Sequence, residues 1–177
     1  MKKVMTTSFL TLSILILFSL NALAQPSPVV STEYTVVQID EMYKKHKMYR
    51  PRDTYPSREL QSRLLKDFPK ARDMEWGKSD VLYEVEFEIG TLPSRDYKAY
   101  YDMSGKLIMY SEEISIKALP AVVKNGVLAE YPNFRFEDAE KIVKGKETFY
   151  RVELEKGDYE VKCVLTRNGA IVSEAVD

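Results

Sequence analysis

The stretch Leu64-Leu-Lys-Asp-Phe-Pro69 returns later in the chain as Val127-Leu-Ala-Glu-Tyr-Pro132. Each stretch closes an apolar, helix-like run with an aromatic residue and a proline, which lacks the N–H that would continue a helix. An alternating, strand-like segment follows each of them, Tyr83-Glu-Val-Glu-Phe87 and Tyr150-Arg-Val-Glu-Leu154. This duplicated order predicts two copies of one structural unit.

The first copy is predicted to begin with a helix after Ser57. The Ser57 hydroxyl can accept a hydrogen bond from a free N–H of the first turn, and Leu60, Leu64 and Phe68 recur four apart on one face. In the strand from Val81 to Ile89, apolar residues alternate with three glutamates. A slip of one residue would bury those carboxylates, so the register is fixed and one sheet face stays in water.

The second copy repeats this pattern. Val123, Val127 and Tyr131 step by four before Pro132, and the later pair Asn168-Gly169 favours a two-residue hairpin. The sequence therefore predicts an α+β protein in which two tandem helix-plus-antiparallel-meander (αββββ) repeats form one curved antiparallel sheet with helices on one face. The predicted units are residues 57–117 and 118–177.

Residues 1–24 have the pattern of a secretory signal peptide. Lys2 and Lys3 precede an apolar run from Phe9 to Leu20, and small residues end at Ala24. The run is shorter than the roughly 20 residues of a membrane-spanning helix. We therefore expect cleavage near Ala24-Gln25, export to the periplasm or the extracellular space, and no transmembrane anchor afterwards.

Residues 25–56 are expected to form a weakly structured N-terminal extension, in which residues 35–39 suit either a short strand or the start of a helix. The basic segment Tyr43–Arg52 could contact an anionic partner, but a short charge run more often forms a solvated surface. His46 lies inside it without a second histidine or a cysteine nearby, which favours a surface residue over a metal ligand.

Charge and cysteine content exclude some classes of protein. The chain has 26 basic and 27 acidic residues, so removing the two lysines of the signal segment gives (26 − 2) − 27 = −3. Because basic residues are interspersed with acidic ones, no nucleic-acid partner is expected. Cys163 is the single cysteine, which rules out an internal disulfide, and its phase in an alternating strand favours a buried, inert thiol.

The Leu-rich helix ending in Phe68-Pro69 or Tyr131-Pro132, Trp76, the Tyr-x-Val-x-Phe/Leu strand and the glycine-centred hairpins at Gly105 and Gly169 together resemble the bacterial PepSY-like family. That family is described as beta-lactamase-inhibitor-like, and the resemblance covers about residues 57–175. It implies an exported α+β fold of tandem helix-plus-meander units. Fold alone does not fix the molecular target.

Strand alternation predicts where a partner could bind. The sheet face opposite the helices would carry charged residues and a tyrosine, which could hold another envelope or extracellular protein. The same pattern suits an ordinary solvated sheet face. The candidate partner-binding residues are Glu84, Glu86, Lys98, Tyr100, Arg151, Glu153 and Lys162.

No catalytic residues, metal ligands or cofactors are predicted. The row Glu84, Glu86 and Glu88 lies on an open strand without a desolvating pocket that would separate the pKa values of its carboxylates. The first functional hypothesis is therefore a non-enzymatic, exported binding module, protein-binding or inhibitor-like. A structural envelope protein or a carrier of small ligands or ions is the alternative, and a hydrolase is a distant third.

Overall fold

The computed structural model of the protein describes residues 35–46, 56–79 and 81–176. The predicted signal segment and residues 47–52 of the basic segment lie outside the described residues. The helices are α1 (Val36–His46), α2 (Arg58–Asp67) and α3 (Ala121–Glu130), with a short 3₁₀ helix η1 (Ile116–Ala118) before α3.

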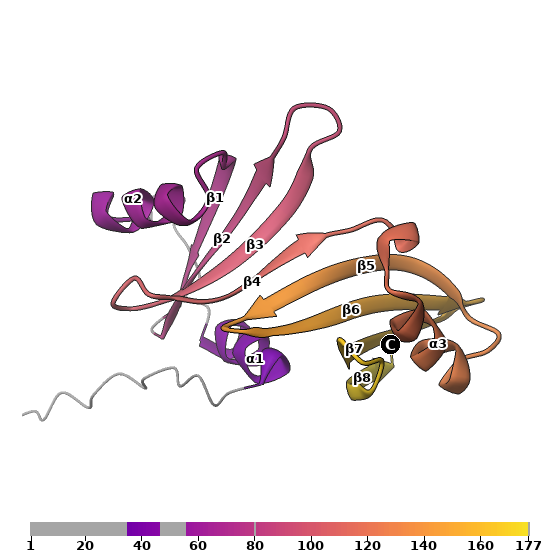
Figure 1. Ribbon diagram of the computed structural model, residues 1–177. Coiled ribbons are helices and arrows are strands. Elements are labelled where there is room, and N and C mark those ends of the chain that lie inside the picture. Colours follow the sequence, from indigo (N-terminus) through magenta and orange to yellow (C-terminus); the bar gives the residue numbers. More distant parts are fainter. Residues whose placement is uncertain (1–34, 47–55, 80, 177) are drawn as a thin grey trace, which may run out of the picture.

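Eight antiparallel strands form one sheet in which every strand pairs with its neighbours in sequence (Figure 1). The strands are β1 (Arg72–Lys78), β2 (Leu82–Ile89), β3 (Arg95–Asp102), β4 (Leu107–Glu113), β5 (Arg135–Lys144), β6 (Glu147–Lys156), β7 (Tyr159–Thr166) and β8 (Ile171–Val176). A helix and four strands thus occur twice in succession. The β4–β5 pair joins the two halves through four residue pairs, from Tyr110↔Val143 to Glu113↔Glu140.

Helix α2 begins and ends where the sequence predicts. The Ser57 hydroxyl accepts a hydrogen bond from the Leu60 N–H at 3.1 Å, and the Phe68 N–H donates to the Leu64 carbonyl at 2.7 Å. Leu60, Leu64 and Phe68 are buried in a cluster with Val85 of β2 and other residues of β1–β4. The face of the sheet that carries Val85 is therefore covered by α2.

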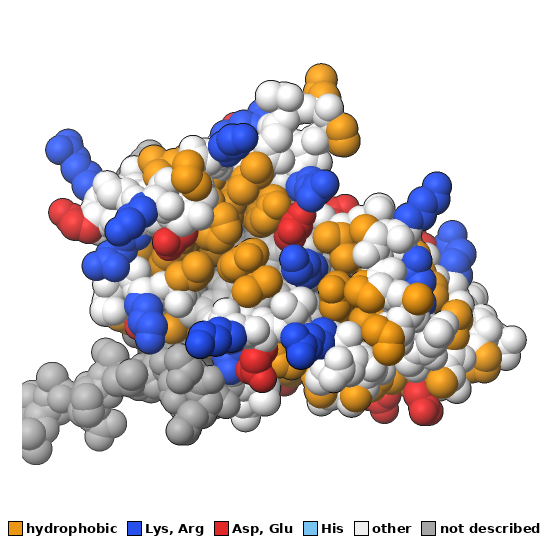
Figure 2. Space-filling view, viewed as in Figure 1, with side chains coloured by type: hydrophobic (Ala, Val, Ile, Leu, Met, Phe, Trp, Pro, Cys, Tyr) orange, Lys and Arg blue, Asp and Glu red, His pale blue; other side chains and the backbone are white. Residues whose placement is uncertain are grey.

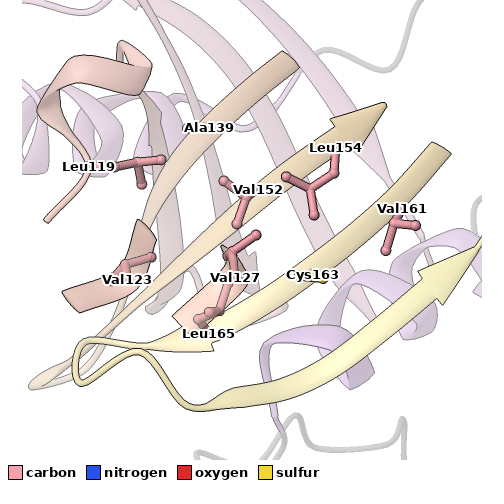
Figure 3. Packing of buried hydrophobic residues seen from close by; sticks show 9 residues of the cluster. All are labelled: Leu119, Val123, Val127, Ala139, Val152, Leu154, Val161, Cys163 and Leu165. Carbon is pink, nitrogen blue, oxygen red and sulfur yellow. The ribbon is translucent and has the colours of Figure 1, made fainter. Parts of the chain in front are cut away.

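Helix α3 packs on the same face of the other half of the sheet. Val123 and Val127 are buried against Val152 and Leu165, and Figure 3 shows this cluster between α3 and strands β5–β7. The Tyr131 N–H closes the helix by donating to the Val127 carbonyl at 2.8 Å. We call this side of the sheet the α2/α3 face.

Helix α1 lies on the opposite side, which we call the α1 face. Its Val36 and Ile39 pack on Leu82, Tyr100, Ile142 and neighbouring residues of β2–β5. Leu82 and Val85 lie three apart in one strand, so they point to opposite faces. The prediction of helices on one face is therefore wrong for α1, and part of the expected weakly structured extension is a packed helix. Val36 and Ile39, which are three residues apart, are too short a pattern to predict that α1 packs on the sheet.

The hairpin at Asn168-Gly169 differs from the predicted two-residue turn. The Gly169 N–H donates to the Thr166 carbonyl, and the Thr166 N–H donates to the Ala170 carbonyl, both at 2.9 Å. The loop therefore has three residues, and Gly169 takes φ = 83° in the left-handed region that glycine tolerates. Gly105 has the same role in the hairpin between β3 and β4. Its N–H donates to the Asp102 carbonyl, and it too lies in the left-handed region.

Hydrophobic side chains also reach the surface around the helices. Figure 2 shows them gathered beside α2 and around α3, in the view of Figure 1. Leu65 of α2 and Leu128 of α3 are among the exposed large apolar residues. Neither helix is therefore purely polar on its outer side.

Candidate functional site

The seven candidate partner-binding residues all belong to the α1 face of the sheet. Residues paired directly across antiparallel strands point to the same side. The pairs Glu84↔Tyr100 and Glu86↔Lys98 join β2 to β3, and Glu153↔Lys162 joins β6 to β7. Arg151 lies two residues before Glu153, on the same side of β6. The structure brings the seven onto one face but spreads them from β2 to β7.

Tyr100 corrects the predicted surface. It lies on the expected side of β3, but it is only 5% exposed because α1 covers it. The sequence predicts this tyrosine on the sheet face that no helix covers. Its burial makes it part of the core under α1, so it is not available to a partner.

Most of the remaining charged candidates are paired with each other. Lys98 lies 2.8 Å from Glu86, and Lys162 lies 3.2 Å from Glu153 and 2.8 Å from Glu160. Surface ion pairs of this kind contribute at most about 1 kcal/mol to stability. They do, however, partly compensate the charges of the β6–β7 part of the face.

Lys98 remains a cation in this setting. Desolvation by burial alone would lower its pKa, but the hydrogen bond to Glu86 and the charges of Glu84, Glu86 and Glu140 outweigh this effect, so the pKa of Lys98 is raised. The ammonium group of Lys98 therefore interacts with carboxylates of the protein itself.

A groove of about 350 Å³ lies on the α1 face over strands β1–β5. Its charged lining consists of one lysine, Lys98, and eight carboxylates. The carboxylates are Asp73, Glu75, Glu86, Glu88, Asp96, Glu113, Asp138 and Glu140. Phe87, Tyr97 and Ser111 complete the lining of what we call the acidic groove.

Half of these carboxylates have cationic partners and half do not. Lys98 pairs with Glu86, Arg151 pairs with Glu140 at 2.8 Å, and Arg72 pairs with Asp73 and Glu88. Among the residues that the structure describes, no lysine or arginine forms an ion pair with the other four. These are Glu75, Asp96, Glu113 and Asp138.

Glu113 lies at the centre of this unpaired group. It faces Glu140 across the β4–β5 ladder. Desolvation by burial raises the pKa of Glu113, and the charges of Asp138, Asp96 and Glu140 and a hydrogen bond with Asp96 raise it further. The folded protein therefore disfavours the ionised form of Glu113 relative to the unfolded chain.

We expect Glu113→Gln to raise the melting temperature near pH 7. The pKa of Glu113 is higher in the folded than in the unfolded state, so the stability cost of its charge is present above the folded pKa and absent below the unfolded pKa. The gain from the substitution should therefore shrink as the pH falls through this window. Thermal melts at a series of pH values measure it.

The matched control is Glu137→Gln, which removes an exposed carboxylate that pairs with Arg135 at 3.0 Å. No pH-dependent gain is expected for this control. A gain of the same size for both variants would mean that net charge, rather than the environment of Glu113, sets the effect.

Most of the groove lies outside the residues that the sequence predicts. Glu86 and Lys98 are among the predicted residues, whereas Ser111, Glu113 and Asp138 are not. Alternation along β5 places Asp138 and Glu140 on the side of Ile142, so a signal was present. The sequence does not show the register of β5 on β4, which places Glu140 opposite Glu113 and so brings these carboxylates next to those of the first half.

The described residues do not form a thiol nucleophile site or a metal site. Cys163 is fully buried, and burial, with a smaller effect from Glu174, raises its pKa to about 11, so it is a poor nucleophile at neutral pH. Across residues 35–46, 56–79 and 81–176, no three His, Cys, Asp or Glu residues are grouped so that they could hold a metal ion. None of the helices within these ranges is long and apolar enough to cross a membrane.

Solved structures share this fold. A BLIP-like protein from Bacteroides fragilis is 24% identical, with a TM-score of 0.59 over 72% of this chain and 88% of its own. A DUF2874 family protein from Bacteroides uniformis is 19% identical, with a TM-score of 0.61 over 69% and 90%. A protein from Bacteroides eggerthii that carries a periplasmic designation is 16% identical, with a TM-score of 0.62 over 69% and 89%.

Sequence comparison gives the family directly. No curated protein matches the chain. The profile of the family described as beta-lactamase-inhibitor-like, PepSY-like matches residues 81–173, which is more than half of the chain and includes strands of both halves. This match confirms the resemblance found in the helix ends, alternating strands and turn glycines. The protein belongs to the PepSY-like, beta-lactamase-inhibitor-like family.

Proposed function

We propose that the protein is an exported, non-enzymatic binding module whose α1 face contacts another envelope or extracellular protein. The observation that carries this proposal is the acidic groove, which four carboxylates without cationic partners line and in which Glu113 lies close to Asp96 and Asp138. Like charges held together destabilise a fold, and such departures from the stable arrangement concentrate at functional sites. The remainder of the predicted surface, including Arg151, Glu153 and Lys162, would form the charged border of the contact.

Export is part of this proposal. Residues 1–24 have the order of a signal peptide, with cleavage near Ala24-Gln25, although they lie outside the described residues. The periplasmic designation of the Bacteroides eggerthii protein with the same fold supports this location. An inhibitor-like role agrees with the family description, and the beta-lactamase or protease that it would address is not specified by any residue of the groove.

We also propose that residues 57–117 and 118–177 are tandem copies of one PepSY-like unit. Each contains a helix that ends in an aromatic residue and a proline, followed by four antiparallel strands. Each has a three-residue hairpin with a left-handed glycine, Gly105 or Gly169, between its last two strands. Of the four carboxylates without cationic partners on the α1 face, three would belong to the first copy (Glu75, Asp96 and Glu113) and one, Asp138, to the second.

A capture experiment tests the binding proposal. The exported protein, tagged at one end, would be cross-linked in envelope extract of its source organism and compared with the double variant Glu84→Lys, Arg151→Glu. We expect one stoichiometric protein partner that the double variant loses, with far-UV circular dichroism showing that the variant is folded. Charge reversal at both sites inverts the pattern that would set the register of the contact.

The control variant is Glu130→Lys, which changes an exposed charge at the end of α3 and leaves the α1 face intact. It should capture the same partner as the unmodified protein. Equal capture by the double variant would place the contact elsewhere. Recovery of cell-wall polymer or lipid alone would instead favour the alternative of a structural envelope protein or a carrier.

A further inference from the structure

The floor of the acidic groove holds a polar group that the fold leaves without a partner. Ser111 of β4 lines the groove and is only 9% exposed. No hydrogen bond joins its hydroxyl to any residue that the structure describes. Buried hydroxyl groups without a partner are rare in folded proteins.

The surroundings of Ser111 define what could satisfy it. Lys98 is paired with Ser111 across β3–β4, but its ammonium group is bound to Glu86. Glu113 lies two residues further along β4, on the same face, and Asp96 of the adjoining strand β3 forms a hydrogen bond with it. A ligand on this floor would therefore meet a hydroxyl and several carboxylate oxygens, which together demand donors and positive charge.

The arrangement of acceptors in the groove indicates the kind of cation. The groove has a volume of about 350 Å³, far more than the roughly 10–15 Å³ that one water molecule needs by the same measure. Asp96 and Glu113 come from neighbouring strands, which lie about 4.8 Å apart, and Ser111 lies two residues from Glu113. Acceptors at this spacing suit a planar group with several N–H donors.

We propose that the acidic groove binds an arginine side chain of the protein partner, with the guanidinium group between Asp96, Glu113 and the Ser111 hydroxyl. This proposal rests on the proposed function, because it names the chemistry of the partner at the α1 face. A guanidinium group carries five N–H donors in a rigid fork, and the hydroxyl can accept one of them. Its charge would also relieve the repulsion around Glu113 that burial and the neighbouring carboxylates create.

Titration with small peptides tests this assignment without knowledge of the partner. The ¹⁵N-labelled exported protein would be titrated with the capped tripeptide Gly-Arg-Gly, and amide shifts would be followed by NMR. The matched peptide contains citrulline, which has nearly the shape of arginine but no charge. We expect saturable shifts confined to β2–β5 with the arginine peptide and none with the citrulline peptide.

Two protein variants make the result specific to the groove. In the double variant Glu113→Gln, Asp96→Asn, amides replace two carboxylates with little change in shape. We expect this variant to bind the arginine peptide about tenfold more weakly or worse, which corresponds to the loss of one charge-assisted hydrogen bond. Ser111→Ala should weaken it less, since the carboxylates remain. The control Glu153→Gln, Glu160→Gln removes two carboxylates that pair with Lys162 outside the groove, and it should bind like the unmodified protein.

Several outcomes would overturn the proposal. Equal binding of the citrulline peptide, equal binding by the groove variant and the unmodified protein, or tighter binding of a Gly-Lys-Gly peptide would each exclude an arginine site. Shifts of the same amides with Ca²⁺ but not with the arginine peptide would make it a metal site. A partner captured from envelope extract that is lost with Glu84→Lys, Arg151→Glu but kept with the groove variant would leave the proposed function standing and the arginine site rejected.

Discussion

Replacing Phe68 with alanine is expected to lower the free energy of unfolding by about 3–5 kcal/mol. Phe68 ends α2 and is only 9% exposed. Its ring centroid lies 4.9 Å from that of Phe87 and 5.2 Å from that of Tyr110, so one ring joins the helix to β2 and β4. Truncation would remove these contacts and leave a cavity that a β-sheet cannot easily close.

Denaturant unfolding followed by circular dichroism measures this loss. The matched control is Leu65→Ala on the same helix, where the side chain is 43% exposed and an effect below about 1 kcal/mol is expected. If Phe68→Ala changed the free energy of unfolding by less than about 1 kcal/mol, α2 would not contribute to the core as its contacts indicate.

Gly126→Ala is expected to destabilise the protein although alanine is the better helix former. Gly126 lies in the middle of α3, where helix propensity alone would favour alanine by about 1 kcal/mol. A Cβ atom at this position would lie 2.1 Å from the Gly169 carbonyl oxygen, which is backbone and cannot rotate away. We expect α3 to shift, at a net cost of about 1–3 kcal/mol.

Asn125→Ala gives the control for this prediction. Asn125 is the exposed neighbour of Gly126, so the substitution gains helix propensity without a clash and should stabilise slightly. Thermal and denaturant melts of both variants compare the two effects in one helix. A stabilised Gly126→Ala variant would mean that α3 does not approach the β7–β8 turn so closely.

The sequence predicts the parts of the fold that depend on local chemistry. Ser57, the steps of four from Leu60 to Phe68 and the proline at position 69 determine α2, because capping, periodicity and a missing N–H act within a few residues. The alternation around Val85 likewise determines which side of β2 is buried. Tyr131 ends α3 in the same way as Phe68 ends α2.

The features that the sequence did not predict depend on contacts between distant segments. The position of α1 is set by packing of Val36 and Ile39 on strands far along the chain. The strand pattern therefore predicts the correct face for Tyr100 but not its burial under α1. The acidic groove was missed for the same reason, since Asp138 becomes part of it only when β5 pairs with β4.

The β4–β5 ladder has a mechanical consequence. It joins the halves through four residue pairs, whereas the adjoining β5–β6 ladder has nine. The groove crosses this short seam, with Glu113 on one side and Asp138 and Glu140 on the other. A ligand that contacts carboxylates on both sides of the seam would hold both halves at once, and by mass action it would make the two halves unfold together. Occupancy of the groove and cohesion of the sheet would in this way be thermodynamically linked.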